Sequence, residues 1–132
     1  TMFTQFMDMH SGGGSKEDFE YIYIEAPEEE AKVIFYNRFG HNPERVTCAC
    51  CGDDYSISES QTLEDATAYE SGCRRCDDKK GYVDEPDLEK SYKTYRTLEE
   101  YKQDKSVLFI SAAEIKKEER SGDVPQEGYV WV

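Results

Sequence analysis

Cys48-Ala-Cys-Cys51-Gly52, followed after twenty more residues by Cys73-Arg-Arg-Cys76, is the stretch around which this chain of 132 residues is organised. Two Cys-x-x-Cys pairs at this separation are typical of a structural site in which four thiolates hold one metal ion. Each pair places two sulfurs on one short turn, and Gly52 allows the first turn to take the left-handed conformation in which backbone N–H groups point at the thiolates. The spacing predicts one structural Zn²⁺, with the ligands Cys48, Cys51, Cys73 and Cys76.

The ligand types leave alternatives to zinc open. A rubredoxin-like iron site uses the same four thiolates, and the cysteines could also form disulfides or stay free thiols. A catalytic zinc is disfavoured because it needs an open coordination position, whereas four thiolates close the shell. The fifth cysteine, Cys50, lacks the two-residue spacing and is predicted to lie outside the shell. His41 is near the cysteines in sequence, but with the shell complete it is predicted to be a loop histidine.

Length and composition favour one domain, residues 1–132, with the zinc-binding module 48–76 inserted within it. Hydrophobic residues make up 37% of the chain and charged residues 34%, so the apolar core is expected to be thin. Ten tyrosines and six phenylalanines would supply much of its bulk. A metal site would help to stabilise a core of this kind.

The formal net charge is −13, and the excess of acid is spread along the chain: −5 in residues 1–47, −4 in 48–76 and −4 in 77–132. Zinc bound by four thiolates would take the total to about −15, because the ligating sulfurs must be deprotonated. Charge of this sign repels phosphates, so no direct binding to DNA or RNA is expected. The preferred partner is a protein with a basic surface.

The expected location is the cytoplasm. No apolar run in the sequence approaches the length of a membrane span, and the first residues lack the charged, apolar and small-residue regions of a signal peptide. In a reducing compartment, cysteines at metal-site spacing indicate metal binding more than disulfides. No membrane association is expected, and the oligomeric state is left open.

The residues on either side of the cysteine stretch predict an α+β fold with a small, mainly antiparallel sheet packed by helices. Residues 3–10 and 20–25 are rich in strand formers and are expected to pair as a hairpin. Residues 107–110 form the most apolar strand and are expected at the centre of the sheet. Residues 128–132 could add an edge strand or pack as a C-terminal strap.

The clearest helix is predicted over residues 27–39. Pro27 suits a first helical position, and the three glutamates after it suit the positive end of the helix dipole. Gly40 supplies a stop. The apolar residues that fall on one face of this helix are Ala31, Ile34, Phe35 and Phe39.

Shorter elements are predicted from their caps. Residues 55–58 are strand-like, and Thr62 would cap a second helix that runs to about residue 71. Thr97 would cap a third helix over 98–103. Ser111-Ala-Ala-Glu114 fits a capping box for a brief charged turn of helix that extends through Glu119.

A second candidate site surrounds the loop Ser11-Gly-Gly-Gly-Ser15, which could serve as a phosphate cradle or an oxyanion loop beside His10. Lys16 lacks the Gly-x-x-x-x-Gly-Lys-Ser/Thr frame, and no Gly-x-Ser-x-Gly elbow occurs, so a plain hairpin loop is favoured. No catalytic residue is assigned, although carboxylate-only chemistry stays open. The residues of this ligand-loop candidate are Asp8, His10, Gly12, Gly13 and Gly14.

Several segments together resemble a known family. The better matches are residues 8–14, 23–31, 35–40 and 46–56, and residues 98–101 and 107–115 match more loosely. In these segments the chain resembles a family of small uncharacterised proteins encoded by tailed phages and prophages. The resemblance covers the N-terminal half well and implies a phage accessory protein. It carries over no activity and no catalytic residue.

Three functions from different classes follow. The favoured one is a small acidic zinc-binding phage protein that binds and modulates a host protein, such as a defence or nucleic-acid enzyme. The second is an enzyme or enzyme subunit with a site around Asp8, His10 and the glycine loop. The third is a virion or assembly component in which zinc serves only stability. The absence of a catalytic motif favours a binding protein over an enzyme.

Overall fold

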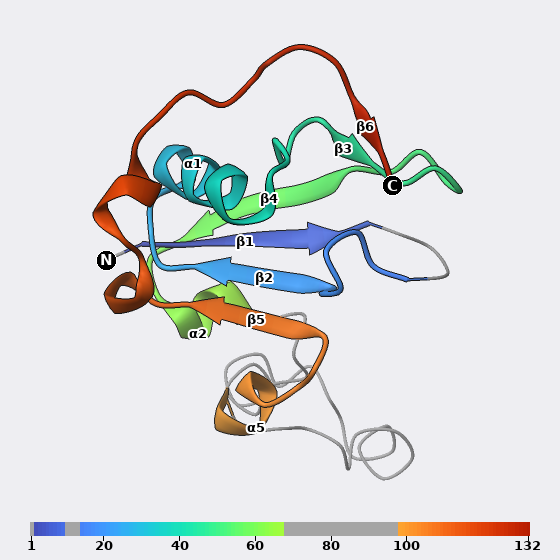
Figure 1. Cartoon of the computed structure of the whole chain (residues 1–132). Coiled ribbons are helices and arrows are strands. Elements are labelled where there is room, and N and C mark those ends of the chain that lie inside the picture. Colours follow the sequence, from blue (N-terminus) through green and yellow to red (C-terminus); the bar gives the residue numbers. More distant parts are fainter. Residues whose placement is uncertain (1, 10–13, 68–97) are drawn as a thin grey trace, which may run out of the picture.

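The described part of the chain, residues 2–9, 14–67 and 98–132, forms a four-stranded sheet with helices on both faces in this computed structural model (Figure 1). The strand order is β4-β1-β2-β5. β1 pairs antiparallel with β2 and β4, whereas β2 and β5 run parallel. The α+β class with a mainly antiparallel sheet is therefore confirmed. The strands are β1 (Phe3–Asp8), β2 (Tyr21–Ile24), β4 (Tyr55–Ser60) and β5 (Val107–Ile110).

The predicted N-terminal hairpin is present. β1 and β2 pair in a register that sets Thr4 opposite Ile24 and Met7 opposite Tyr21. Residues 10–13 of the connecting loop lie outside the described residues. β4, which the sequence marks only as strand-like, pairs along the whole of β1 and lies at one edge of the sheet.

β5 lies at the opposite edge, so the prediction that it is central is wrong. Its apolar character has another cause, because both of its faces are covered. Leu108 and Ile110 pack into the cluster under α1, while Val107 and Phe109 pack on the other face of the sheet. An unbroken apolar run thus indicates that both faces of the strand are covered, and it does not indicate how many strands lie beside it.

β6 (Val130–Trp131) does not join this sheet. It pairs in parallel with β3 (Val46–Thr47) to form a separate two-stranded sheet. The N–H of Val130 donates to the carbonyl of Arg45 at 2.8 Å, and the N–H of Val132 donates to the carbonyl of Thr47 at 3.0 Å. Of the two predicted arrangements, the C-terminal strap is the one found. It returns across α1 and ends beside β3 (Figure 1).

Helix α1 (Glu28–Phe39) has the predicted extent, beginning one residue later because Pro27 is its N-cap with an extended ψ of 158°. The Glu59 carboxylate of β4 accepts the N–H of Glu28 at 2.7 Å, which places a negative charge at the positive end of the helix. Gly40 ends the helix with φ at +78° and donates its N–H to the carbonyl of Tyr36.

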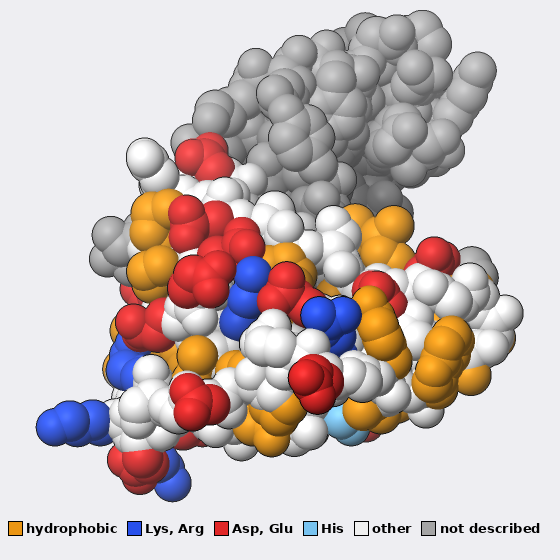
Figure 2. Space-filling model, turned by 90° about the horizontal axis from the view of Figure 1, so that it is seen from above, with side chains coloured by type: hydrophobic (Ala, Val, Ile, Leu, Met, Phe, Trp, Pro, Cys, Tyr) orange, Lys and Arg blue, Asp and Glu red, His pale blue; other side chains and the backbone are white. Residues whose placement is uncertain are grey.

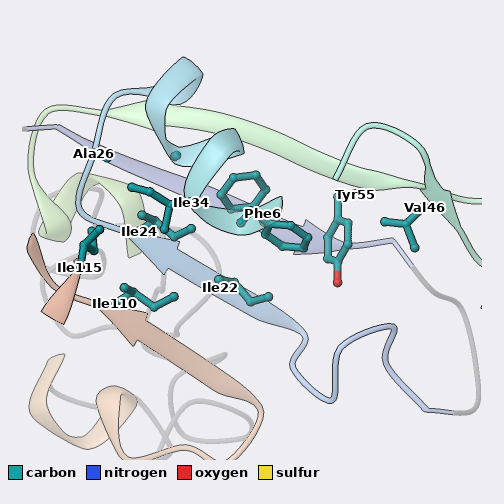
Figure 3. Close-up of a cluster of buried hydrophobic side chains, with 11 residues drawn as sticks. Phe6, Ile22, Ile24, Ala26, Ile34, Val46, Tyr55, Ile110 and Ile115 are labelled. Atoms are coloured by element: carbon teal, nitrogen blue, oxygen red, sulfur yellow. The ribbon is translucent and has the colours of Figure 1, made fainter. Parts of the chain in front are cut away.

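The larger hydrophobic cluster fills the space between α1 and the sheet (Figure 3). Phe6 of β1 and Phe35 of α1 are fully buried, with ring centroids 4.8 Å apart, and Tyr55 of β4 closes the cluster toward β3. Ile22 and Ile24 of β2 point to this side. Three of the four predicted face residues, Ala31, Ile34 and Phe35, are fully buried, and Phe39 is half-buried.

The other face of the sheet is covered by α2 (Leu63–Thr67) and α5 (Leu98–Lys102). The alternation of tyrosine and isoleucine in β2 divides that strand between the two faces, and Tyr23 belongs to this one. Its hydroxyl lies 2.9 Å from that of Tyr101, and its ring stacks on Phe109 with centroids 4.8 Å apart.

The predicted caps are confirmed where the structure describes them. The hydroxyl of Thr62 accepts the N–H of Asp65 at 3.0 Å, and Ser111 donates its N–H to the Glu114 carboxylate at 3.4 Å. The charged turn after Ser111 consists of two short 3₁₀ helices, η1 (Ala112–Glu114) and η2 (Lys117–Arg120). The end of the second helix and Thr97 lie outside the described residues.

Candidate metal centre

The loop from Cys48 to Asp53 follows β3 directly and is closed by its own backbone. Cys48 donates its N–H to the carbonyl of Asp53 at 3.0 Å, and Gly52 donates its N–H to the carbonyl of Cys48 at 2.7 Å. Gly52 has φ at +74°, the left-handed conformation that the sequence predicts for it. Ala49 donates its N–H to the carbonyl of Val132 at 2.8 Å, so the C-terminal strand also holds the loop.

This turn brings three thiols together. The sulfurs of Cys48, Cys50 and Cys51 all lie within 4.8 Å of one another, and those of Cys48 and Cys50 are 2.9 Å apart. The N–H of Cys50 points at the Cys48 sulfur, 3.4 Å away, which is the backbone-to-sulfur contact expected in such a turn. A cluster of three cysteine sulfurs of this size could hold a metal ion.

The three cysteines differ in exposure. Cys48 is 2% exposed, Cys51 is half-buried and Cys50 is exposed. Spacing alone does not predict that Cys50 reaches the cluster, because the approach of its sulfur depends on how the turn folds. Cys73 and Cys76 lie outside the described residues, so the predicted four-cysteine ligand set stays a prediction.

The electrostatics of the cluster favour a thiolate at Cys48. Burial raises the pKa of Cys48, but hydrogen bonds from Cys50 and Cys51 outweigh it and lower that pKa to about 6. The hydrogen bond to Cys48 is the main reason that the pKa of Cys50 rises to about 11. Since the thiolate is the form that binds metal, Cys48 is the sulfur best prepared for a soft cation at neutral pH.

Of the second candidate site, the structure describes Asp8 and Gly14, together with the neighbouring Lys16. Asp8 ends β1, and its carboxylate lies 2.5 Å from the ammonium of Lys16 and accepts the backbone N–H of Lys16 at 2.8 Å. Both side chains are 1% exposed. Gly14 is exposed, and the other predicted residues of this site, His10, Gly12 and Gly13, lie outside the described residues.

His41 lies in the loop after α1, as predicted, and its Nδ1 is 2.6 Å from a carboxylate oxygen of Glu17. The described cluster of potential metal ligands contains the three cysteines and does not include His41. The carboxylate of Glu17 orients the imidazole ring, so this histidine has a role that sequence spacing does not reveal.

Comparisons with protein-family models, with curated proteins and with solved structures find no match to this chain. The resemblance to phage proteins therefore stays a prediction. Within the described ranges, no helix is both long enough and apolar enough to cross a bilayer.

Proposed function

We propose that this protein is an acidic zinc-binding accessory protein, in which one thiolate-bound zinc ion fixes the cysteine loop and the surface beside it binds a partner protein. The observation that carries the proposal is the gathering of three thiols on a turn held by backbone hydrogen bonds. Thiolates select soft or borderline metals, and zinc in a thiolate shell is structural.

The proposed ligands are Cys48 and Cys51, together with Cys73 and Cys76. Two features of the turn support Cys48 and Cys51 as one half of the shell: the N–H of Cys50 points at the Cys48 sulfur, and the left-handed Gly52 follows Cys51 directly. The short distance between the Cys48 and Cys50 sulfurs makes Cys50 the competing ligand, so the ligand set needs a direct test.

Metal analysis of protein purified without chelator tests the site. About one zinc per chain is expected, because four thiolates fill a tetrahedral shell. Cys48→Ser should lose the metal and much of the stability, whereas the matched variant Cys50→Ser should keep both. A zinc content near zero in the unmodified protein would contradict the proposal. A red colour with visible absorption would indicate iron. Equal loss in Cys50→Ser would place Cys50 in the shell.

The partner surface is proposed at the C-terminal strand. Four consecutive apolar residues there are 51%, 42%, 62% and 43% exposed: Tyr129, Val130, Trp131 and Val132. Figure 2 shows hydrophobic side chains at the surface on the side where β3 and β6 lie, next to a face on which acidic side chains outnumber basic ones. Exposed aromatic residues surrounded by acidic side chains are complementary to a partner surface that has an apolar patch surrounded by basic residues.

The proposed partner is a host protein such as a defence or nucleic-acid enzyme. The resemblance to phage proteins supports this class of partner, and the proposed location of the encounter is the host cytoplasm. A net charge of −13 complements the basic surface with which such an enzyme binds nucleic acid.

Affinity capture from host lysate with the wild type and with Trp131→Ser tests the partner. Wild type should retain a basic protein that Trp131→Ser fails to retain. Capture should also weaken as salt shortens the Debye length to about 8 Å and below. Equal capture by both proteins, or capture that does not respond to salt, would count against this surface.

A further inference from the structure

Arg45 is a half-buried cation in a strongly acidic protein. Among the described residues no carboxylate lies within ion-pair distance of its guanidinium, and its buried Nε has no hydrogen-bond partner. An arginine stays charged at any pH at which the protein is folded, and burying its donors without acceptors is costly. Among the described residues, the other buried or half-buried side chains with a positive charge pair with carboxylates: Lys16, Lys32 and Arg120.

The guanidinium of Arg45 is held in place by groups that carry no negative charge. Its Nη1 donates to the hydroxyl of Tyr129 at 3.1 Å, and its Cζ lies 5.2 Å from the centroid of the Tyr129 ring. Its backbone is fixed as well, since its N–H donates to the carbonyl of Asn42 and its carbonyl accepts from Val130. The side chain is therefore preorganised, which lowers the entropic cost of binding a ligand.

Beside Arg45 lies a cavity of about 220 Å³, between the end of α1, the turn that follows it and the C-terminal strap. The residues that line it include Tyr36, His41, Asn42 and Tyr129. The volume is sufficient for a phosphate or carboxylate group with a small organic substituent. Among the polar groups of these residues and the neighbouring guanidinium, the hydroxyls and the guanidinium donate hydrogen bonds to such anions.

His41 adds a second polar group with a defined orientation. The Glu17 carboxylate accepts from Nδ1, 2.6 Å away, so the proton of the neutral ring lies on Nδ1. Within the described part of the chain, Nε2 has no hydrogen-bond partner. In this tautomer Nε2 is an acceptor, so in the cavity that His41 lines it can take a hydrogen bond from a P–OH group of a phosphate, whereas a carboxylate offers it no donor.

We propose that this cavity binds a small oxyanion, a carboxylate or a phosphate, through the guanidinium of Arg45 with Tyr129 and His41 beside it. Binding of the anion would depend on directional hydrogen bonds and not on a net positive charge of the cavity. Glu127 also lines the cavity, and the negative end of the α1 dipole lies at Gly40. Glu127 is exposed, so water screens its charge more strongly than it screens the half-buried guanidinium.

NMR titration of the full-length, metal-loaded protein tests this site. Inorganic phosphate and acetate are titrated separately, with sodium chloride holding the ionic strength constant. A saturable shift of the Arg45 Nε–Hε and His41 ring signals is expected, with a Kd of about 1 mM or below. The anion with the lower Kd identifies phosphate or carboxylate as the preferred class. No saturable shift with either anion would overturn the proposal.

Variants localise the effect. Arg45→Gln should weaken binding by at least about tenfold, while Lys117→Gln, which changes the net charge equally at an exposed position, should leave it unchanged. If Arg45→Gln does not fold, Tyr129→Phe replaces it, because it removes only the hydroxyl that holds the guanidinium, and it should weaken binding too. Binding that stays unchanged in the folded pocket variant overturns the proposal.

Discussion

Asp8 and Lys16 form an ion pair that is removed from water almost completely, with 1% of each side chain exposed. Lys16→Met would leave the Asp8 carboxylate buried without its counter-charge. Losing one partner of a buried pair costs about 3–5 kcal/mol, so the free energy of unfolding should fall by that order. Urea denaturation at neutral pH measures the loss.

An exposed pair provides the control. Lys102 lies 3.6 Å from Glu99, with 37% and 79% of the two side chains exposed, and Lys102→Met should change the free energy of unfolding by less than about 1 kcal/mol. The double variant Asp8→Leu, Lys16→Met should be more stable than Lys16→Met alone, because neither charge then remains buried. If Lys16→Met costs no more than Lys102→Met, the pair is solvated in solution.

Tyr55 carries a buried hydroxyl with no hydrogen-bond partner among the described residues. Burial raises the pKa of Tyr55 above its usual value, and the negative charges of Glu17 and Asp8 add to this. A phenol whose folded-state pKa is raised contributes stability below the unfolded pKa of about 10 and loses it as pH rises further. Urea denaturation should show wild-type stability falling above about pH 10 more steeply than that of Tyr55→Phe.

At neutral pH the same variant has a different expected outcome. Tyr55→Phe removes a buried polar atom that makes no hydrogen bond, so the free energy of unfolding should stay the same or rise. A decrease of more than about 1 kcal/mol would show that the hydroxyl has a partner in solution.

The candidate sites show how far residue-level prediction reaches. Spacing indicates Cys48 and Cys51, because a Cys-x-x-Cys turn is local. Spacing does not show that the Cys50 sulfur lies 2.9 Å from that of Cys48, which depends on the dihedral angles of the turn. The sequence also could not predict that Arg45 makes no ion pair with any described residue, since ion pairing depends on how the chain folds.

At the scale of elements, the end of α1 offers a test of backbone conformation. Gly40 has φ at +78° with open space around it, so Gly40→Ala meets no clash and its cost comes from the left-handed backbone alone. That cost is about 1–2 kcal/mol in the free energy of unfolding. Thermal and urea denaturation of the variant measure it.

Gly14→Ala is the matched control, since Gly14 also has open space around it but no positive φ. This variant should be neutral or slightly stabilising, because alanine restricts the unfolded chain. If both alanine variants lose the same amount of unfolding free energy, the left-handed conformation at Gly40 is not the cause of the loss in Gly40→Ala.

Prediction of the elements succeeded where the signals are local. Three glutamates after Pro27 and a glycine at 40 bracket α1, and the strand-forming residues on both sides of the glycine loop specify the hairpin. The position of β5 at an edge and the pairing of β6 with β3 could not be predicted in the same way. Strand neighbours far apart in sequence are chosen by packing, and the apolar run in β5 reflects two covered faces.

For the whole molecule, the net charge of −13 predicts that nucleic acid is not a ligand. Fluorescence anisotropy with labelled single- and double-stranded oligonucleotides at low salt should show no binding, because phosphates meet a repulsive potential over most of the surface. Saturable binding at micromolar protein would refute the charge argument. Nucleic acid would then become a candidate ligand.

Strand β6 ends at Trp131, the single tryptophan of the chain, which is 62% exposed and pairs with Thr47, next to Cys48. The indole is thus a built-in optical reporter between the cysteine loop and the proposed partner surface. Its emission can follow undocking of the last strand without an added dye, and through the hydrogen bond from Ala49 to Val132 it is coupled to the cysteine loop. A label fused after Val132 would disturb the very signal that the native chain already supplies.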